Sequence, residues 1–345
     1  MRVLTVIGNR PQFVKAAAVS DRLRAVATEV MVHTGQHYDD DMSRVFFDEL
    51  GLPRPEHRLD LGRGSNTEQT ACMLSALGAL LIAEAPDAVL VYGDTNSTLA
   101  GALAAAQVRV PVAHVEAGMR SFDRAMPEEL NRVLTDHASD LLLCPADAPA
   151  ANLRAERVAG RIEVVGDVMV DVARLVAERV PEPDFEDYVL VTAHRAGNVD
   201  DPARLAMLVE LLLAVPGPVV FPLHPRTRAR LETAGLLERL AAGTTLLGPL
   251  GYLDFTGYVR HARAVLTDSG GVQKEAYLAG VPCVTLRDTT EWTETVDAGW
   301  NTLVDLDAGA ALAALSRTPP PERAALYGDG RAGERVVEAL IRLCG

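Results

Sequence analysis

Three carboxylates in the first half of the chain stand where α/β proteins place catalytic groups. Asp94 follows the apolar run Ala88–Tyr92, Glu116 follows the run Val112–Val115, and Glu128 lies in a predicted first helical turn. A carboxylate in such a position can take or give a proton in general acid–base catalysis. Asp94 could instead cap a helix, and Glu128 could simply face a helix dipole. An ionised Glu116 directly after an apolar strand needs a partner, which favours a functional site.

Basic side chains follow the first apolar run. The segment 8–15 carries Arg10 and Lys15 at a predicted junction between a strand and a helix. It lacks the three-glycine pattern of dinucleotide-binding proteins, so a nicotinamide-dependent dehydrogenase is not expected. Two cations beside helix amides suit a phosphate group, although Arg10 could serve only to close the turn.

The second half of the chain carries the pattern most typical of an anion site. Ser269, Gly270 and Gly271 lie between a predicted strand and a predicted helix, where backbone N–H groups can bind a pyrophosphate. Glu275, about one turn into that helix, could accept hydrogen bonds from ribose hydroxyls. His194 ends another apolar run at the ligand edge, although an isolated histidine is more often structural. Nothing around Ser269 resembles a serine protease.

The composition of the chain excludes several classes of binding partner and indicates the cellular compartment. The net charge of −14 argues against nucleic acid, an anionic membrane or a polyanion as the main partner. No run reaches about 18 apolar residues and the N-terminal segment lacks a signal-peptide pattern, so a cytoplasmic protein is expected. The four cysteines are scattered along the chain, which indicates small buried apolar side chains and neither a set of disulfides nor a zinc site. Thr34-Gly35 separate His33 from His37 after a strand, so no metal site is expected.

Short β-branched runs alternate with longer helical stretches, and this pattern positions the candidate residues. Two successive series predict two doubly wound α/β domains with ligands at the carboxyl ends of the strands. The first series is 3–7, 30–33, 88–92, 112–115 and 141–144, and the second is 164–165, 188–192, 219–223, 245–247, 264–266 and 283–286. We expect an N-terminal Rossmann-like domain over 1–168, a C-terminal one over 169–330, and a helix over 331–345 that could pack back on the first domain.

Taken in order, the motifs resemble those of the non-hydrolysing UDP-N-acetylglucosamine 2-epimerases over nearly the whole chain. The matching segments are GNRPQFVK (8–15), HTGQHYD (33–39), GDTNSTLAG (93–101), HVEAGMRS (114–121), MPEELNR (126–132), TAHR (192–195), LTDSGGVQKEA (266–276) and RDTTEWTETV (287–296). The resemblance implies a GT-B fold, in which two Rossmann-like domains hold the active site in the cleft between them. It also implies a homodimer, a UDP-sugar substrate, no NAD and no catalytic metal.

The reaction that the resemblance implies begins with anti elimination of UDP across C1–C2, which gives a 2-acetamidoglucal. UDP then re-adds syn, with the proton returned to the opposite face of C2. The catalytic residues that match the family motifs are Asp94, Glu116, Glu128 and His194. The substrate-binding residues that match are Arg10 and Lys15 near the diphosphate and sugar, Ser269, Gly270 and Gly271 on phosphate, Glu275 on the ribose and Phe255 beside the uracil. Which carboxylate takes the C2 proton is left open.

Two segments depart from the family pattern. Many members have TTERPE, where the arginine contributes to the ligand site, and this chain has TEWTE at 290–294. This segment and its neighbours look closer to a branch that epimerises UDP-2,3-diacetamido-2,3-dideoxyglucuronate, which makes that sugar an alternative substrate. After the GQH motif, the segment 38–42 replaces the glutamines of an allosteric site, so no obligatory activation by substrate is expected.

Other reaction classes stay open at this point. A GT-B glycosyltransferase would share the fold but transfer the sugar to an acceptor. A hydrolysing epimerase would release the free sugar and UDP. A non-catalytic sensor would gain nothing from three carboxylates in its site, because their negative charges repel a bound diphosphate. The main expectation is reversible epimerisation of UDP-N-acetylglucosamine to UDP-N-acetylmannosamine, serving a cell-wall polymer, a capsule or a secondary metabolite.

Overall fold

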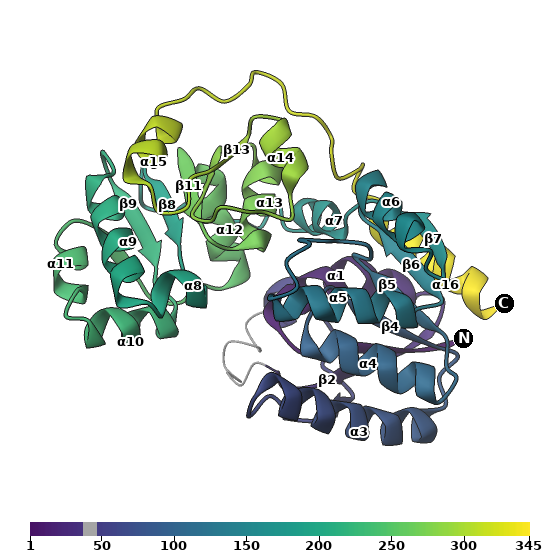
Figure 1. The fold of residues 1–345 in the computed structure, drawn as a ribbon. Helices are drawn as coiled ribbons and strands as arrows, with labels where there is room; N and C mark the ends of the chain where they lie inside the picture. The colour runs from purple at the N-terminus through teal and green to yellow at the C-terminus, as the bar shows by residue number, and fades with distance from the viewer. Residues whose placement is uncertain (37–46) are drawn as a thin grey trace. The chain divides into compact units, whose positions relative to one another are not determined.

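The structure is a computed structural model that describes residues 1–36 and 47–345. Contacts divide the chain into two compact units (Figure 1). Unit 1 comprises Met1–Ala177 and Ala325–Gly345, and unit 2 comprises Glu178–Ala324. His37 and the segment 38–42 lie outside the described residues, and so do the predictions about a metal site and about substrate activation that rest on them.

Unit 1 is built on a seven-stranded parallel sheet. Its strands are β1 (Arg2–Ile7), β2 (Thr28–His33), β3 (His57–Arg58), β4 (Ala88–Tyr92), β5 (Val112–Val115), β6 (Leu141–Cys144) and β7 (Arg161–Val164). The order β3-β2-β1-β4-β5-β6-β7 reverses direction between β1 and β4, as in a doubly wound Rossmann-like domain. Every residue of β4 and β5 is buried, because a parallel sheet is covered on both faces.

Helices cover the sheet of unit 1. They are α1 (Arg10–Arg24), α3 (Asn66–Glu84), α4 (Asn96–Gln107), α5 (Pro127–Ala138), α6 (Asp147–Glu156), α7 (Val168–Leu175) and α16 (Ala332–Cys344). Helix α4 packs between α3 and α5, and α16 returns from the end of the chain to pack against α1 and α7 (Figure 1). The apolar face of α16, with Val336, Val337 and Leu340 buried, explains this return.

Unit 2 repeats the same design on a six-stranded parallel sheet. Its strands are β8 (Val189–Thr192), β9 (Val219–Pro222), β10 (Thr245–Leu247), β11 (Ala264–Thr267), β12 (Cys283–Thr285) and β13 (Asn301–Leu303). Its helices are α8 (Ala196–Val199), α9 (Pro202–Ala214), α10 (Pro225–Thr233), α11 (Leu237–Ala241), α12 (Tyr252–His261), α13 (Gly270–Ala279), α14 (Thr293–Asp297) and α15 (Ala308–Leu315). The order β10-β9-β8-β11-β12-β13 reverses between β8 and β11. The predicted α/β class with two Rossmann-like sheets is confirmed, and it is the GT-B fold.

Several details of the sequence prediction need correction. The sequence predicts the run 164–165 in the second sheet, whereas β7 pairs with β6 at the edge of unit 1. The short strands β3 and β13 were not predicted, since neither carries an apolar run long enough to indicate a strand. Unit 1 extends to Ala177, past the expected boundary at 168, because α7 packs on α1. Cys72 is exposed, unlike the buried Cys144 and Cys283.

Candidate active site

The candidate site of unit 1 lies at the carboxyl ends of β4 and β5. Tyr92 pairs with Val115, so Asp94 and Glu116 follow the two strands at the same edge of the sheet. The backbone turns sharply there, with a φ of +66° at Gly93 and +70° at Glu116. The left-handed region costs a non-glycine residue roughly 1–2 kcal/mol, and such strained residues cluster at functional sites.

Glu116 forms an ion pair with Lys15 of α1, and each side chain is only 12% exposed. A Cβ at Gly93 would lie 3.0 Å from Lys15 Nζ and 3.3 Å from Glu116 Oε2. Glycine at this position therefore leaves room for the pair as well as allowing the turn. The sequence predicts Lys15 beside a diphosphate, and in unit 1 its ammonium group pairs with the half-buried carboxylate of Glu116.

Asp94 is bound by an arginine of α5. Its Oδ2 accepts hydrogen bonds from Arg132 Nε at 3.0 Å and from Arg132 Nη2 at 2.6 Å. The N-cap of α4 is Thr95, which forms a capping box with Thr98. The alternative that Asp94 caps this helix is therefore wrong. Its carboxylate, 31% exposed, stays accessible beside a guanidinium group.

The first turn of α5 carries two carboxylates with different surroundings. Glu128 is exposed, whereas Glu129 is only 3% exposed. Glu129 accepts hydrogen bonds from Ser121 N at 2.8 Å, Ser121 Oγ at 2.9 Å, Phe122 N at 3.0 Å and Arg132 Nη1 at 3.0 Å. Burial opposes its charge, but these hydrogen bonds outweigh burial and lower the pKa of Glu129. Glu129 thus orders the loop before α5 and leaves Glu128 at the surface.

Arg10 is the first residue of α1 and is half-buried. The helix is capped by Asn9, whose side chain accepts a hydrogen bond from the Gln12 N–H. The Gln12 side chain accepts a hydrogen bond from Gly8 N at 2.7 Å and donates one to Tyr92 O at 2.9 Å. These bonds join the start of α1 to the end of β4, so Arg10 begins a helix anchored at the same sheet edge as the carboxylates.

The corresponding edge of unit 2 is organised by Asp268, which is fully buried. Thr192 pairs with Thr267, so the turns after β8 and β11 lie side by side. The Asp268 carboxylate accepts hydrogen bonds from His194 N at 3.0 Å and Arg195 N at 3.0 Å. It therefore fixes the turn that carries His194, whose side chain is 42% exposed.

The His194 imidazole stacks on His224, with ring centroids 5.6 Å apart. Loss of surrounding water lowers the pKa of His194, while Asp268 acts in the opposite direction and Arg195 and Arg226 add to the lowering. A histidine with this shift is largely neutral at pH 7, and it can accept a proton or a hydrogen bond from a ligand.

The sequence predicts an anion site at the N-terminus of α13. Gly270 and Gly271 open the helix, and its first-turn N–H groups have no side-chain cap. Around Gly270, a Cβ would lie 3.5 Å from Glu291 Oε2, 3.5 Å from Trp292 Nε1 and 4.0 Å from Arg195 Nη2. Ser269 differs from the prediction, because its N–H donates to Thr267 Oγ1 at 2.9 Å within the turn.

Glu275 and Phe255 are both half-buried in unit 2. Burial raises the pKa of the Glu275 carboxyl to about 7, against a smaller opposite effect of Lys274. A desolvated carboxyl of this kind gains most from a ligand that donates hydrogen bonds, such as a ribose. Phe255 on α12 packs partly against the core that α12 and α13 share with the sheet, which leaves part of its ring accessible.

Sequence reasoning missed Arg132, Glu129 and Asp268, although each lies within a motif that it had singled out. The signal that could have found them is the charge accounting already applied to Glu116, extended to Asp94 and to the backbone. A carboxylate beside an apolar strand needs a cation, and backbone N–H groups at a strand end need an acceptor. Asp268 meets the second need and Arg132 meets the first for Asp94.

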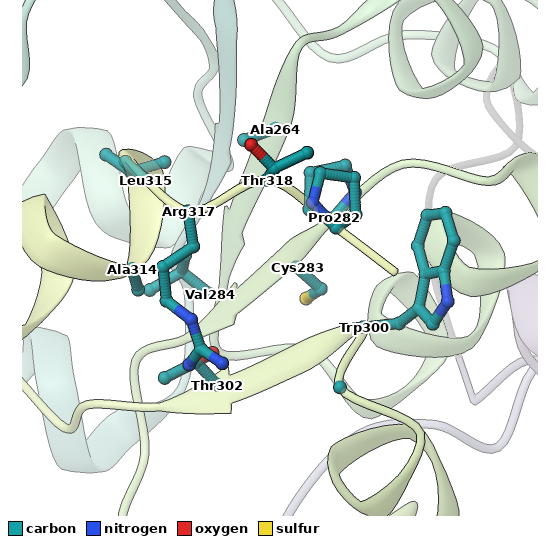
Figure 2. A pocket seen from close by; sticks show the side chains of 12 residues that line it. Ala264, Pro282, Cys283, Val284, Trp300, Thr302, Ala314, Leu315, Arg317 and Thr318 are labelled. Atoms are coloured by element: carbon teal, nitrogen blue, oxygen red, sulfur yellow. The ribbon is translucent and has the colours of Figure 1, made fainter. Parts of the chain in front are cut away.

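A cavity lies elsewhere in unit 2 (Figure 2). Its volume of about 20 Å³ suffices for about one water molecule. Cys283, Trp300 and Arg317 are among its lining residues, and the candidate site residues are not. Within residues 1–36 and 47–345 the structure contains no group of three His, Cys, Asp or Glu side chains that could hold a metal. In the same residues no helix has the length and apolar character to cross a membrane.

Comparison with known proteins bears on this arrangement. A family model described as UDP-N-acetylglucosamine 2-epimerase matches residues 21–341. The chain belongs to the UDP-N-acetylglucosamine 2-epimerase family. Membership makes it an enzyme of an isomerase family, as the motifs predicted.

Relatives of this epimerase family member cover its whole length. It is 46% identical to the UDP-2,3-diacetamido-2,3-dideoxy-D-glucuronate 2-epimerase of Pseudomonas aeruginosa, over 99% of this chain and 100% of that protein. The crystal structure of the UDP-GlcNAc 2-epimerase of Methanocaldococcus jannaschii in complex with UDP-GlcNAc and UDP matches with a TM-score of 0.93 and 39% identity. That match covers 99% of this chain and 100% of that chain.

Proposed function

We propose that this member of the epimerase family catalyses the reversible epimerisation of UDP-N-acetylglucosamine to UDP-N-acetylmannosamine at C2. The observation that carries the proposal is the pairing of two strand-end carboxylates with cations in unit 1. Glu116 pairs with Lys15, and Asp94 pairs with Arg132 at 2.6 Å. Carboxylates held in this way can exchange protons with a bound sugar while the cations limit the charge around a diphosphate.

The reaction would proceed through elimination and re-addition. One carboxylate removes the C2 proton, the C1–O bond breaks with its electron pair leaving on UDP, and a C1–C2 double bond forms. UDP then attacks C1 again while a proton is delivered to the opposite face of C2. Asp94, Glu116 and Glu128 are the proposed acid and base groups, and each positioned group typically contributes about 10²–10⁴-fold.

Unit 2 would bind the nucleotide part of the substrate. The uncapped first turn of α13 at Gly270 and Gly271 presents N–H groups suited to a diphosphate. Glu275 would accept the ribose hydroxyls, and Phe255 would contact the uracil. His194, fixed by Asp268, would bind or protonate an oxygen of the diphosphate. Arg10 and Lys15 of unit 1 would attract the same negative charge.

A second substrate has a specific observation in its favour. The relative with 46% identity over 99% of this chain is named as a 2-epimerase of UDP-2,3-diacetamido-2,3-dideoxy-D-glucuronate. The same elimination and re-addition would serve that sugar, since both substrates carry UDP at C1 and an acetamido group at C2. The two candidates therefore differ in the substituents at C3 and C5 and share the chemistry.

We further propose that the enzyme works as a homodimer in the cytoplasm on precursors of a polysaccharide. Exposed apolar side chains in unit 1, with Phe122 at 75%, Leu130 at 49% and Leu134 at 40%, support a subunit contact. Light scattering at micromolar concentration would test the oligomeric state, and a monomer under these conditions would contradict the proposal.

The substrate is tested by incubating the enzyme separately with each of the two UDP-sugars and following both C2 epimers by NMR. We expect a kcat/KM at least about tenfold higher for one sugar than for the other. Formation of UDP-N-acetylmannosamine supports the first substrate, and a preference for the uronate supports the second. Release of UDP and free sugar would contradict both by indicating a hydrolase, and transfer of the sugar to an added acceptor would indicate a glycosyltransferase.

A further inference from the structure

A buried histidine lies directly behind the two candidate strand ends of unit 1. His114, on β5, is fully buried. Its Nε2 lies 2.7 Å from the carbonyl oxygen of Gly93, and its Nδ1 lies 2.7 Å from Asp136 Oδ1. Asp136, on α5, is also fully buried. The side chain of His114 therefore connects the turn after β4 to the last turn of α5.

The hydrogen bonds of this dyad place a partner on each nitrogen of the His114 ring. A carbonyl oxygen only accepts, so Nε2 of His114 donates its proton to Gly93. Nδ1 forms the second hydrogen bond, with the carboxylate of Asp136. Burial opposes the charge of Asp136, but its hydrogen bond with His114 and the charges of His114 and Arg120 outweigh burial and lower the pKa of Asp136.

The second oxygen of Asp136 holds the turn after β5. Its Oδ2 accepts hydrogen bonds from Gly118 N at 3.1 Å and from Arg120 Nη1 at 2.7 Å. Arg120 continues the network outward, because its Nε and Nη2 donate to Glu156 of α6 at 2.8 and 2.7 Å. One carboxylate thus binds the loop that begins with Glu116 as well as the histidine that holds Gly93.

The three elements that meet at this dyad are those that carry the three candidate carboxylates. Asp94 follows Gly93, Glu116 precedes Gly118 by two positions, and Glu128 lies on α5 with Asp136. The strained φ of +70° at Glu116 also requires surroundings that hold the backbone firmly.

We propose that His114 and Asp136 are positioning residues that fix Asp94, Glu116 and the helix carrying Glu128 relative to one another. The expected effect on kcat rests on the proposed function. The expected effect on the backbone around Gly93 and Gly118 rests on the hydrogen bonds alone. The dyad touches no substrate in this account. It acts through the backbone of Gly93 and Gly118, so its loss should lower kcat and leave substrate binding in unit 2 unchanged.

Three variants distinguish the loss of the Asp136 charge from the loss of the hydrogen bonds that hold the two turns. In Asp136→Asn, the amide N–H₂ can donate to Nδ1 of a neutral His114, and the amide oxygen can still accept from Gly118 and Arg120. Asp136→Ala removes both connections. His114→Asn keeps a donor toward Asp136 and loses the hydrogen bond to Gly93.

The matched control is Glu29→Gln at the start of β2. Glu29 is also buried, at 4% exposure, and accepts a hydrogen bond from Thr5 Oγ1 at 2.6 Å and one from Arg24 Nε at 3.0 Å. It lies at the amino end of its strand, away from the edge where ligands bind. Glu29→Gln therefore shows what the loss of a buried carboxylate does when that carboxylate does not position the site.

Two measurements on the whole chain are compared, kcat and KM for the UDP-sugar and backbone amide hydrogen exchange. We expect Asp136→Ala to lower kcat by about 100-fold, since a displacement near 1 Å is enough for such a loss. Its KM should stay within about threefold, and Asp136→Asn should retain kcat within about tenfold. Amides of 93–96 and 116–120 should exchange at least about tenfold faster in Asp136→Ala, and only those of 93–96 in His114→Asn.

The outcomes are distinct. Equal damage to kcat in Asp136→Asn and Asp136→Ala, or unchanged exchange in both segments of Asp136→Ala, would overturn the positioning role. The same kcat loss and the same exchange pattern in Glu29→Gln would overturn it as well, by showing general destabilisation. If the wild-type chain epimerises neither UDP-sugar, the proposed function fails, and the exchange measurements still decide whether the dyad holds the two turns.

Discussion

Lys15 and Glu116 lie 101 positions apart in the sequence and form an ion pair at the carboxyl edge of the sheet of unit 1, each side chain 12% exposed. The pair joins the first helix of the chain to the strained end of β5. It gives a half-buried carboxylate its counterion.

Replacing Glu116 by Gln should abolish most of the activity and leave the fold intact. The amide keeps the shape of the side chain but cannot take or give a proton, so turnover should fall by about 10²–10⁴-fold. Steady-state kinetics and the circular dichroism spectrum would test this. Glu84→Gln is the control. Glu84 also forms an ion pair, with Arg2, but Arg2 begins β1 and so lies at the amino end of that strand, away from the ligand edge. Comparable loss in both variants would contradict a catalytic role for Glu116.

Gly93→Ala should damage the site through both backbone strain and crowding. The residue has a φ of +66°, and a Cβ would lie 3.0 Å from Lys15 Nζ. We expect a loss of about 1–2 kcal/mol in the free energy of unfolding and a lower kcat. Gly78→Ala in α3 is the matched control, because nothing lies within 4 Å of its Cβ. That change should stabilise the protein by about 0.5–1 kcal/mol, as measured by urea denaturation. A neutral Gly93→Ala would refute the account of this turn.

Substitution of Glu128 should affect activity, whereas substitution of its neighbour Glu129 should affect stability. Glu128→Gln, at an exposed position, should lower kcat by about 10²-fold or more with little change in stability. Glu129→Gln should lower the free energy of unfolding by about 2–4 kcal/mol, because four hydrogen bonds to a buried carboxylate are weakened.

The pH dependence of the Glu129 effect follows from its lowered pKa. A lowered pKa in the folded state stabilises the protein above the ordinary value of 4.5, and this stability is lost as the pH falls below that value. The penalty of Glu129→Gln should therefore be full at pH 7 and shrink toward pH 4, as measured by chemical denaturation. An unchanged penalty at low pH would contradict this assignment.

Glu275 should make unit 2 less stable as the pH rises. Its pKa is raised from 4.5 to about 7, so the folded state holds a proton that the unfolded state releases, and stability falls between those two values. Glu275→Gln should remove this slope and raise the melting temperature by several degrees at pH 8.5 but not at pH 4.5. Scanning calorimetry of the two proteins at both pH values would test it, and parallel pH profiles would count against the raised pKa.

The sequence predicted most of the sheets because their strands are buried on both faces and read as uninterrupted apolar runs. It also predicted that Asp94 and Glu116 share one edge, which follows from parallel pairing alone. It misplaced β7, whose residues Arg161–Val164 are half exposed and lack such a run.

The partners of the candidate residues could not be predicted in the same way. Arg132 lies 38 positions from Asp94, and Asp268 lies 74 positions from His194. The first contact depends on how α5 packs on the sheet and the second on which strands are neighbours, and local sequence patterns encode neither. Charge accounting indicated that a partner must exist for Glu116, and the fold supplied Lys15.

The most direct test of the central claim is proton NMR of the wild-type protein with UDP-N-acetylglucosamine in D₂O. Elimination and re-addition exchange the C2 proton with solvent, so we predict UDP-N-acetylmannosamine carrying deuterium at C2 and progressive loss of the C2 proton signal from the substrate. A folded protein that produces the second epimer without deuterium at C2 would contradict the proposed proton transfer by the carboxylates. Full retention of the C2 proton with both UDP-sugars would contradict the proposed function itself.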